Sequence, residues 1–179
     1  MWLIDVLRRL ARALSIAGGV AAAIGIVLIA AVILLEIVLR TFFATSTFMS
    51  DELVGYLVAA TGFLPLGYTF AEGGILRVNL LLGRIDRTPR LRVLVELVCV
   101  AATLAVLGLL IWHFWGNVSR QYSRGYTSGT MSGIPQWIPT GTMLAGLAIF
   151  WFQVFAYGLG VASGREPVLA EEQDETAVG

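Results

Sequence analysis

The chain has 179 residues, of which 58% are hydrophobic and 13% charged, and its formal net charge is zero. This composition is typical of a membrane protein, and the balanced charge excludes a basic nucleic-acid-binding surface. A single cysteine (Cys99) excludes an internal disulfide, and a single histidine (His113) cannot supply the paired axial ligands of a membrane haem, so we expect no cofactor and no metal site.

Residues 2–14 have the periodicity of an amphipathic helix. Leucines and a valine fall on one stripe, and Asp5 falls on the opposite one together with Arg8, Arg9 and Arg12. We expect this helix to lie in the membrane interface, with its arginines toward anionic lipid headgroups. An unstructured basic leader that only sets the topology is the alternative interpretation.

The stretch from Ile16 to Leu35 is twenty residues long and carries neither a charge nor a hydroxyl group. As a helix it measures about 30 Å, the thickness of a bilayer hydrocarbon core. The predicted fold is therefore an all-α integral membrane protein with a single four-helix domain over residues 1–163 and an acidic, disordered tail over 164–179. The predicted transmembrane helices cover residues 16–39, 53–71, 91–115 and 137–161.

Glu36 and Arg40 lie near the end of the first predicted helix. They are four residues apart, so their side chains can pair on one face. We interpret them as a structural pair or a partner contact. The alternative is that Glu36 carries a proton or an ion, since carboxylates are costly in lipid and are usually functional there.

Ser50, Asp51 and Glu52 open the second predicted helix. We expect the Ser50 hydroxyl to cap free N–H groups, and the two acids to favour the positive end of the helix dipole. Pro65 falls in the middle of this membrane segment. It predicts a kink, because it removes the hydrogen bond to the Thr61 carbonyl.

The second loop, residues 72–90, contains an apolar run with spaced arginines, among them Arg77 and Arg84. The run is too short to span a bilayer and too apolar for open solvent. We therefore predict a short interfacial segment whose arginines contact lipid headgroups. Beyond it, Glu96 is expected to pair with Arg92, four residues earlier.

Small residues recur at helical spacing on three of the predicted helices, and such stripes let another backbone approach closely. They exceed what the packing of four helices needs, so we expect at least one, on the first two helices, to face a second protein. The stripes are Gly18/Ala22/Gly25, Gly55/Ala59/Gly62 and Ala101/Ala105/Gly108. The candidate partner-interface residues are Glu36, Arg40, Asp51, Glu52, Gly55, Ala59, Gly62 and Trp137.

The arginines predict the orientation, because the chain has no lysine. Nine of the twelve arginines fall in the N-terminal segment, the second loop with the start of the third helix, and the C-terminal tail. The other side of the predicted membrane domain carries only Arg40, Arg120 and Arg124. By the positive-inside rule, both termini are expected in the cytoplasm of a bacterium, with the protein in its inner membrane.

Several short motifs occur in a characteristic order along the chain. Glu36 and Arg40 close the first predicted helix, and Ser50-Asp51-Glu52-Leu53 opens the second. Further motifs are Gly62 to Glu72, Leu76-Arg77-Val78-Asn79-Leu80 and Ile134-Pro135-Gln136-Trp137-Ile138-Pro139. In this order, spacing and topology the chain resembles the small, DctQ-type membrane subunit of tripartite ATP-independent periplasmic (TRAP) transporters. Leu76 and Asn79 stand where that family usually has a histidine and an aspartate.

The resemblance implies a sodium-driven importer of an organic acid. A periplasmic substrate-binding protein would dock transiently, and a large membrane subunit would carry substrate and sodium. This chain would brace the large subunit in a heterodimer, without being an enzyme. Two alternatives stay open: a self-sufficient four-helix proton-coupled exporter that uses Glu36, and a membrane scaffold protein without a solute.

Overall fold

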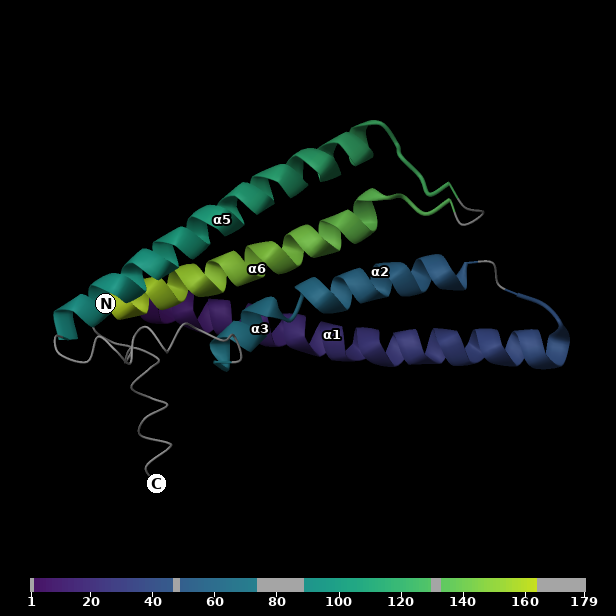
Figure 1. Ribbon diagram of the computed structural model, residues 1–179, viewed down its shortest axis with the longest axis horizontal. Coiled ribbons are helices and arrows are strands. Elements are labelled where there is room, and N and C mark those ends of the chain that lie inside the picture. Colours follow the sequence, from purple (N-terminus) through teal and green to yellow (C-terminus); the bar gives the residue numbers. More distant parts are fainter. Residues whose placement is uncertain (1, 47–48, 74–88, 130–132, 164–179) are drawn as a thin grey trace, which may run out of the picture.

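The computed structural model describes residues 2–46, 49–73, 89–129 and 133–163. Four helical segments in this part of the chain are long and apolar enough to cross a membrane, which confirms the predicted fold class. One of these segments is divided into two helices, α2 and α3 (Figure 1). The helices are α1 (Trp2–Phe43), α2 (Ser50–Phe63), α3 (Leu66–Ala71), α5 (Pro89–Ser123) and α6 (Trp137–Ala162).

Helix α1 is one unbroken helix of 42 residues, so the predicted separate interfacial helix is wrong. Residues 2–14 are helical as expected, but neither glycine nor proline separates them from the first membrane segment, and the helix continues into it. Ala11 and Ser15 are completely buried, which fixes this segment against the other helices. The uncharged part of α1, Ala13–Leu35, is about 35 Å long and matches a bilayer core.

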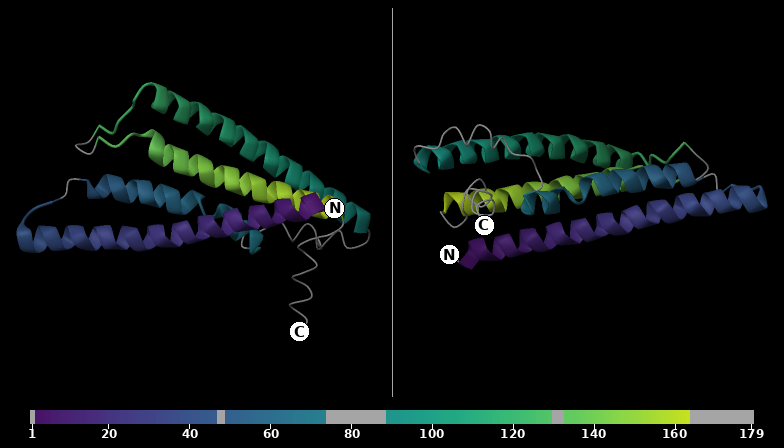
Figure 2. Two further views of the ribbon diagram at one scale, coloured as in Figure 1. Left: turned by 180° about the vertical axis from the view of Figure 1, so that it is seen from behind. Right: turned by 60° about the horizontal axis from the view of Figure 1, so that its bottom comes forward.

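Helix α6 lies in the middle of the bundle, where it contacts every other helix. Helix α5 packs on one side of α6, and α1, α2 and α3 all contact α6 on the other side (Figure 2). The helices converge at the end where α1 begins and α6 ends, called here the terminal end (Figure 1). They spread apart toward the opposite end, which carries residues 44–46 and 124–129 and is called here the loop end (Figure 1).

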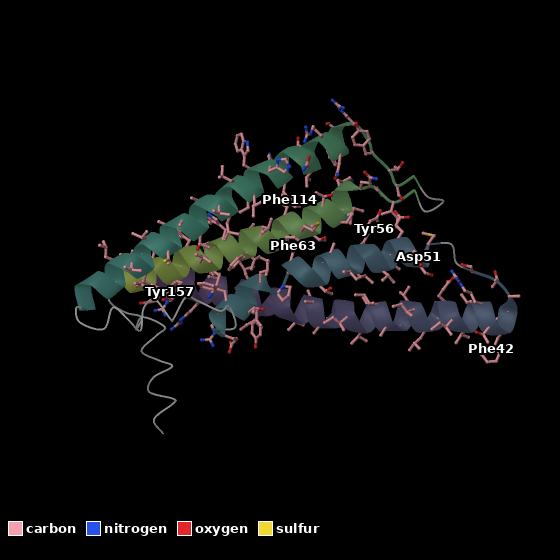
Figure 3. The ribbon with its side chains drawn as sticks, viewed as in Figure 1. Phe42, Asp51, Tyr56, Phe63, Phe114 and Tyr157 are labelled. Carbon is pink, nitrogen blue, oxygen red and sulfur yellow. The ribbon has the colours of Figure 1, made fainter. Side chains whose placement is uncertain are left out.

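The apolar core is built around α6, α5 and the short helix α3. Phe70 of α3 packs edge to face against Tyr157 and Phe150, with ring centroids 5.6 and 5.7 Å apart. Toward the loop end, the ring of Phe63 in α2 approaches that of Phe114 in α5, with centroids 6.3 Å apart (both labelled in Figure 3). The buried core residues are Phe70, Val100, Leu107, Leu147, Val154, Tyr157 and Val161.

The predicted kink at Pro65 is a complete break between α2 and α3. Two glycines hold the broken backbone from opposite sides. A Cβ atom on Gly18 of α1 would clash with the carbonyl oxygen of Leu64, and one on Gly146 of α6 would lie 2.5 Å from the carbonyl oxygen of Phe63. Only glycine permits this approach, so the break is fixed in place by its neighbours.

Helix α5 extends two turns beyond its predicted end and reaches Ser123. The extension packs on α6, because Tyr122 meets Trp137 edge to face at 5.7 Å. Gly125, with a φ of +61°, ends the helical path. A short hairpin follows, in which Ser128 N–H donates to Ile134 at 2.9 Å and Gln136 N–H donates to Tyr126 at 3.0 Å.

The predicted interfacial segment of the second loop lies outside the described residues, and so do Arg77, Arg84 and the acidic tail. Pro89 occupies the first position of α5, where its missing N–H and fixed φ suit a helix start.

Candidate functional site

Glu36 organises the loop end of the bundle. Its residue is only 8% exposed, and three donors reach its carboxylate. Arg40 Nε donates at 2.8 Å, which confirms the predicted pair, and the hydroxyls of Ser46 and Ser50 donate at 2.5 and 2.7 Å. Both carboxylate oxygens are therefore engaged within the chain, and they tie α1 to the connection after it and to the start of α2.

The predicted helix cap at Ser50 is wrong. Helix α2 begins at Ser50 itself, so Met49 takes the N-cap position and offers no side-chain hydrogen bond to the free N–H groups. The hydroxyl of Ser50 is instead directed at Glu36, because a buried carboxylate is a stronger acceptor partner than a helix end that water can reach. Asp51 and Glu52 do lie in the first turn of α2, as expected.

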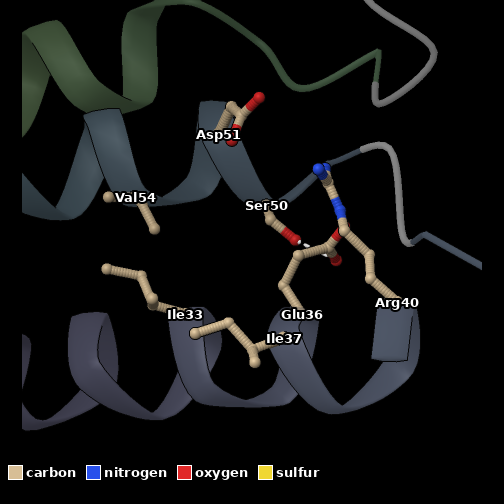
Figure 4. A pocket seen from close by; sticks show the side chains of 7 residues that line it. All are labelled: Ile33, Glu36, Ile37, Arg40, Ser50, Asp51 and Val54. Atoms are coloured by element: carbon tan, nitrogen blue, oxygen red, sulfur yellow. Dashed lines mark hydrogen bonds and ion pairs between the residues drawn. The ribbon is translucent and has the colours of Figure 1, made fainter. Parts of the chain in front are cut away.

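A pocket of about 360 Å³ opens beside Glu36, between α1 and α2 (Figure 4). Aliphatic side chains line the part away from the loop end, and Arg40 and Asp51 line the part toward it, called here the mouth. The side chain of Arg40 is 62% exposed even though its Nε is paired. The seven lining residues are Ile33, Glu36, Ile37, Arg40, Ser50, Asp51 and Val54.

A second polar contact joins α2 to the hairpin after α5. The hydroxyl of Tyr56 donates to Glu52 one turn earlier, and Ser128 of the hairpin hydrogen-bonds to the same hydroxyl. Sequence reasoning missed Tyr56 and Ser128. The spacing of four residues between Glu52 and Tyr56 was a usable signal for the first contact, but no spacing rule connects either residue to Ser128.

Two hydrogen bonds between helices were also not predicted from the sequence. Ser15 of α1 donates to Gln153 of α6 at 3.2 Å, and Tyr157 of α6 donates to Glu96 of α5 at 3.0 Å. The expected partner of Glu96, Arg92, has a side chain outside the described ones. The bonds join residues 138 and 61 positions apart, so no local pattern predicts them.

The three small-residue stripes differ in what they face. The first belongs to a buried seam of α1 whose members alternate at spacings of four and three residues, as in a coiled coil. A Cβ atom on Gly25, for example, would lie 2.6 Å from a methyl group of Thr61 in α2. The seam comprises Ala11, Ser15, Gly18, Ala22 and Gly25, and the next buried residue of α1 is Glu36.

The second stripe is open. A Cβ atom on Gly55 or Gly62 would meet no atom of the described chain within 4 Å. Ala59 between them is partly exposed, and Val58 beside it is 54% exposed. We call Gly55, Ala59 and Gly62 the α2 stripe. In the described part of the chain it is a small-residue surface on which a backbone from outside the chain can pack closely.

The third stripe is divided between inside and outside. Gly108 faces Trp151 of α6, whose indole N–H donates to the Leu104 carbonyl at 3.2 Å. Ala101 and Ala105 are exposed on the outer side of α5. Trp137, the remaining candidate interface residue, packs on Tyr122 of its own chain.

At the terminal end, three of the arginines predicted to meet lipid headgroups lie on α1. Arg9 and Arg12 are exposed, and Arg8 is partly so. Arg12 also approaches Glu72 after α3, at 3.8 Å. This pair is solvent-exposed and contributes little to stability, so it leaves Arg12 accessible to a headgroup.

The described residues include no group of histidine, cysteine, aspartate and glutamate that could hold a metal ion. The polar groups at the loop end are instead arranged as acceptors and donors for one another. Such an arrangement fixes helices relative to one another.

Replacing Glu36 by glutamine tests this structural role. The substitution keeps the shape but removes the charge that strengthens the bonds from Ser46 and Ser50, so the free energy of unfolding is expected to fall by about 2 kcal/mol. Denaturant titration of the purified chain measures the change. Assembly of the chain with a partner membrane protein should suffer more than ion coupling. A variant that assembles normally but loses all proton or sodium dependence would contradict the structural role.

The model of one protein family matches the chain over residues 29–159, and that family is the DctQ component of the tripartite ATP-independent periplasmic transporters. The matched region runs from the C-terminal part of α1 to the last turn of α6. No curated protein and no solved structure gives a significant match.

Proposed function

This chain belongs to the DctQ family, which makes it the small permease subunit of a TRAP transporter, and from this membership we propose that it braces the large transport subunit of a sodium-driven organic acid importer. In this role it also forms part of the surface on which a periplasmic substrate-binding protein docks. The substrate and sodium sites lie in the large subunit.

The observation that carries the bracing role is the open α2 stripe. Lipid tails are as apolar as leucine, so membrane helices associate through close packing and polar contacts. A Cβ atom on Gly55 or Gly62 would meet no other described element within 4 Å, whereas one on Gly18 would meet Leu64 and one on Gly25 would meet Thr61. We propose that a helix of the large subunit packs on the α2 stripe, with Asp51 at its outer margin.

The exporter alternative has less support. It needs a carboxylate that can exchange protons with a transport pathway, and both oxygens of Glu36 accept hydrogen bonds from neighbouring side chains. Those contacts suit a residue that holds α1 and α2 together.

The proposed function is tested by co-expression with a large TRAP subunit and a periplasmic substrate-binding protein from the same organism. Uptake of an organic acid into proteoliposomes should require all three proteins and an inward sodium gradient. The matched control contains this chain alone, which should transport nothing. Proton-coupled export by the chain alone would instead establish the exporter.

The proposed orientation places both termini in the cytoplasm, as the arginine distribution favours. Thr45 and Gly129 lie at the loop end and should therefore react from outside after replacement by cysteine. The measurement uses an impermeant thiol reagent on intact cells, in a Cys99→Ala background that removes the native thiol. Labelling of Arg84→Cys together with protection of Gly129→Cys would reverse the orientation.

A further inference from the structure

The pocket beside Glu36 is lined by aliphatic and by charged side chains, which are separated along the helix axes. Ile33 and Ile37 of α1 face Val54 of α2, and both isoleucines are open to the outside of the bundle, at 43% and 54% exposure. Arg40 and Asp51 lie farther toward the loop end, at the mouth (Figure 4). The pocket is thus aliphatic below and charged above.

The two charged groups at the mouth are available to a ligand. Arg40 uses Nε for Glu36, and among the described residues its two terminal nitrogens make no hydrogen bond. Within the same part of the chain, Asp51 accepts no hydrogen bond and forms no ion pair, although it is near enough to influence Arg40. Within the described chain, one edge of a guanidinium and one carboxylate thus line the same pocket without a hydrogen-bond partner.

The position of the pocket along α1 matches the boundary between the hydrocarbon core and the headgroups of a membrane. The uncharged stretch of α1 ends at Leu35, so Ile33 lies at the end of the hydrocarbon region and Arg40 about one turn beyond Glu36, at headgroup level. A phospholipid has the same order of chemistry along its length: acyl chain, phosphate, and then the headgroup substituent.

We propose that this pocket binds one phospholipid whose headgroup is zwitterionic and ends in a primary ammonium. The acyl chain lies on Ile33, Ile37 and Val54, the phosphate accepts hydrogen bonds from the terminal nitrogens of Arg40, and the ammonium donates to Asp51. A lipid with a neutral glycerol headgroup leaves Asp51 without a cation, and a quaternary ammonium cannot donate a hydrogen bond to it. The proposal is independent of the transport role.

The experiment measures phospholipid retention on the purified full-length chain by native mass spectrometry. The chain is delipidated and then offered phosphatidylethanolamine, phosphatidylglycerol or phosphatidylcholine in separate samples. The wild type should retain one phosphatidylethanolamine in preference to the other two. Arg40→Gln should weaken this retention about tenfold, because a charge-assisted contact to the phosphate is lost. Asp51→Asn should abolish the preference over phosphatidylglycerol.

Two further variants separate the pocket from general effects of charge or folding. Val54→Phe fills the aliphatic part without changing any charge, and it should also lower retention. Arg120→Gln removes an exposed arginine near the loop end of α5, outside the pocket, and it should leave retention unchanged. Equal retention by wild type, Arg40→Gln and Val54→Phe would overturn the proposal, and so would equal retention of all three lipids. The same variant is also co-expressed with the large subunit. If Arg40→Gln no longer co-purifies with the large subunit but retains lipid as the wild type does, a protein side chain occupies the pocket, and the proposal is overturned.

Discussion

Replacement of Gly146 by alanine is expected to lower the free energy of unfolding by about 3 kcal/mol or more, although it adds only a methyl group. That methyl group would lie 2.5 Å from the carbonyl oxygen of Phe63 and 2.9 Å from the amide nitrogen of Leu64. These are backbone atoms on the broken segment between α2 and α3, and they cannot rotate away as the end of a side chain can. Helix α6 would therefore have to move away from α2. Denaturant titration of the purified chain measures the loss.

Gly18→Ala should have an effect of similar size, because its methyl group would meet the carbonyl oxygen of Leu64 from the side of α1. Gly55→Ala and Gly62→Ala are matched controls on α2, where nothing in the described chain lies within 4 Å. Alanine favours helices over glycine, so the controls should be neutral or slightly stabilising. If all four variants had the same stability, the close approach of α1 and α6 to the break would be refuted.

Leucine at Gly55 or Gly62 is expected to reduce co-purification with the large subunit at least about tenfold, while membrane insertion of this chain persists. The leucine side chain occupies the space that a partner backbone needs on the α2 stripe, and overpacking at a contact costs about 1–3 kcal/mol. The fold itself should tolerate the change, since both glycines are exposed in the chain. Affinity purification of the co-expressed complex, with both subunits quantified, provides the measurement.

Ala101→Leu is the control for this prediction. Ala101 is also a small, exposed residue, but it lies on α5, on the far side of α6 from α1. Its replacement should leave the yield of complex unchanged. An unchanged yield for both α2 variants would show that the α2 stripe faces lipid, and the interface would then be sought on α5 and α6.

Much of the arrangement was predictable because it depends on local chemistry. Glu36 and Arg40 pair as expected, since residues four apart on a helix are always neighbours. The break at Pro65 was expected as a kink, because proline removes a backbone donor wherever it stands. In contrast, the interfacial helix was predicted from its polarity alone, and the continuous α1 shows that amphipathicity does not decide where a helix ends.

By itself the sequence determined the four membrane segments, because the transfer of a long apolar run into lipid is a sum over its own residues. Tertiary structure decided which faces of those segments are closed. The stripes on α1 and α2 are alike as sequence, yet Gly18 and Gly25 face neighbouring helices while Gly55 and Gly62 face outward. Tertiary structure also directs the hydroxyl of Ser50 to Glu36 instead of to its own helix end, and it pairs Ser15 with Gln153. These outcomes depend on how helices rotate and cross, and that is set by contacts between residues far apart in the chain.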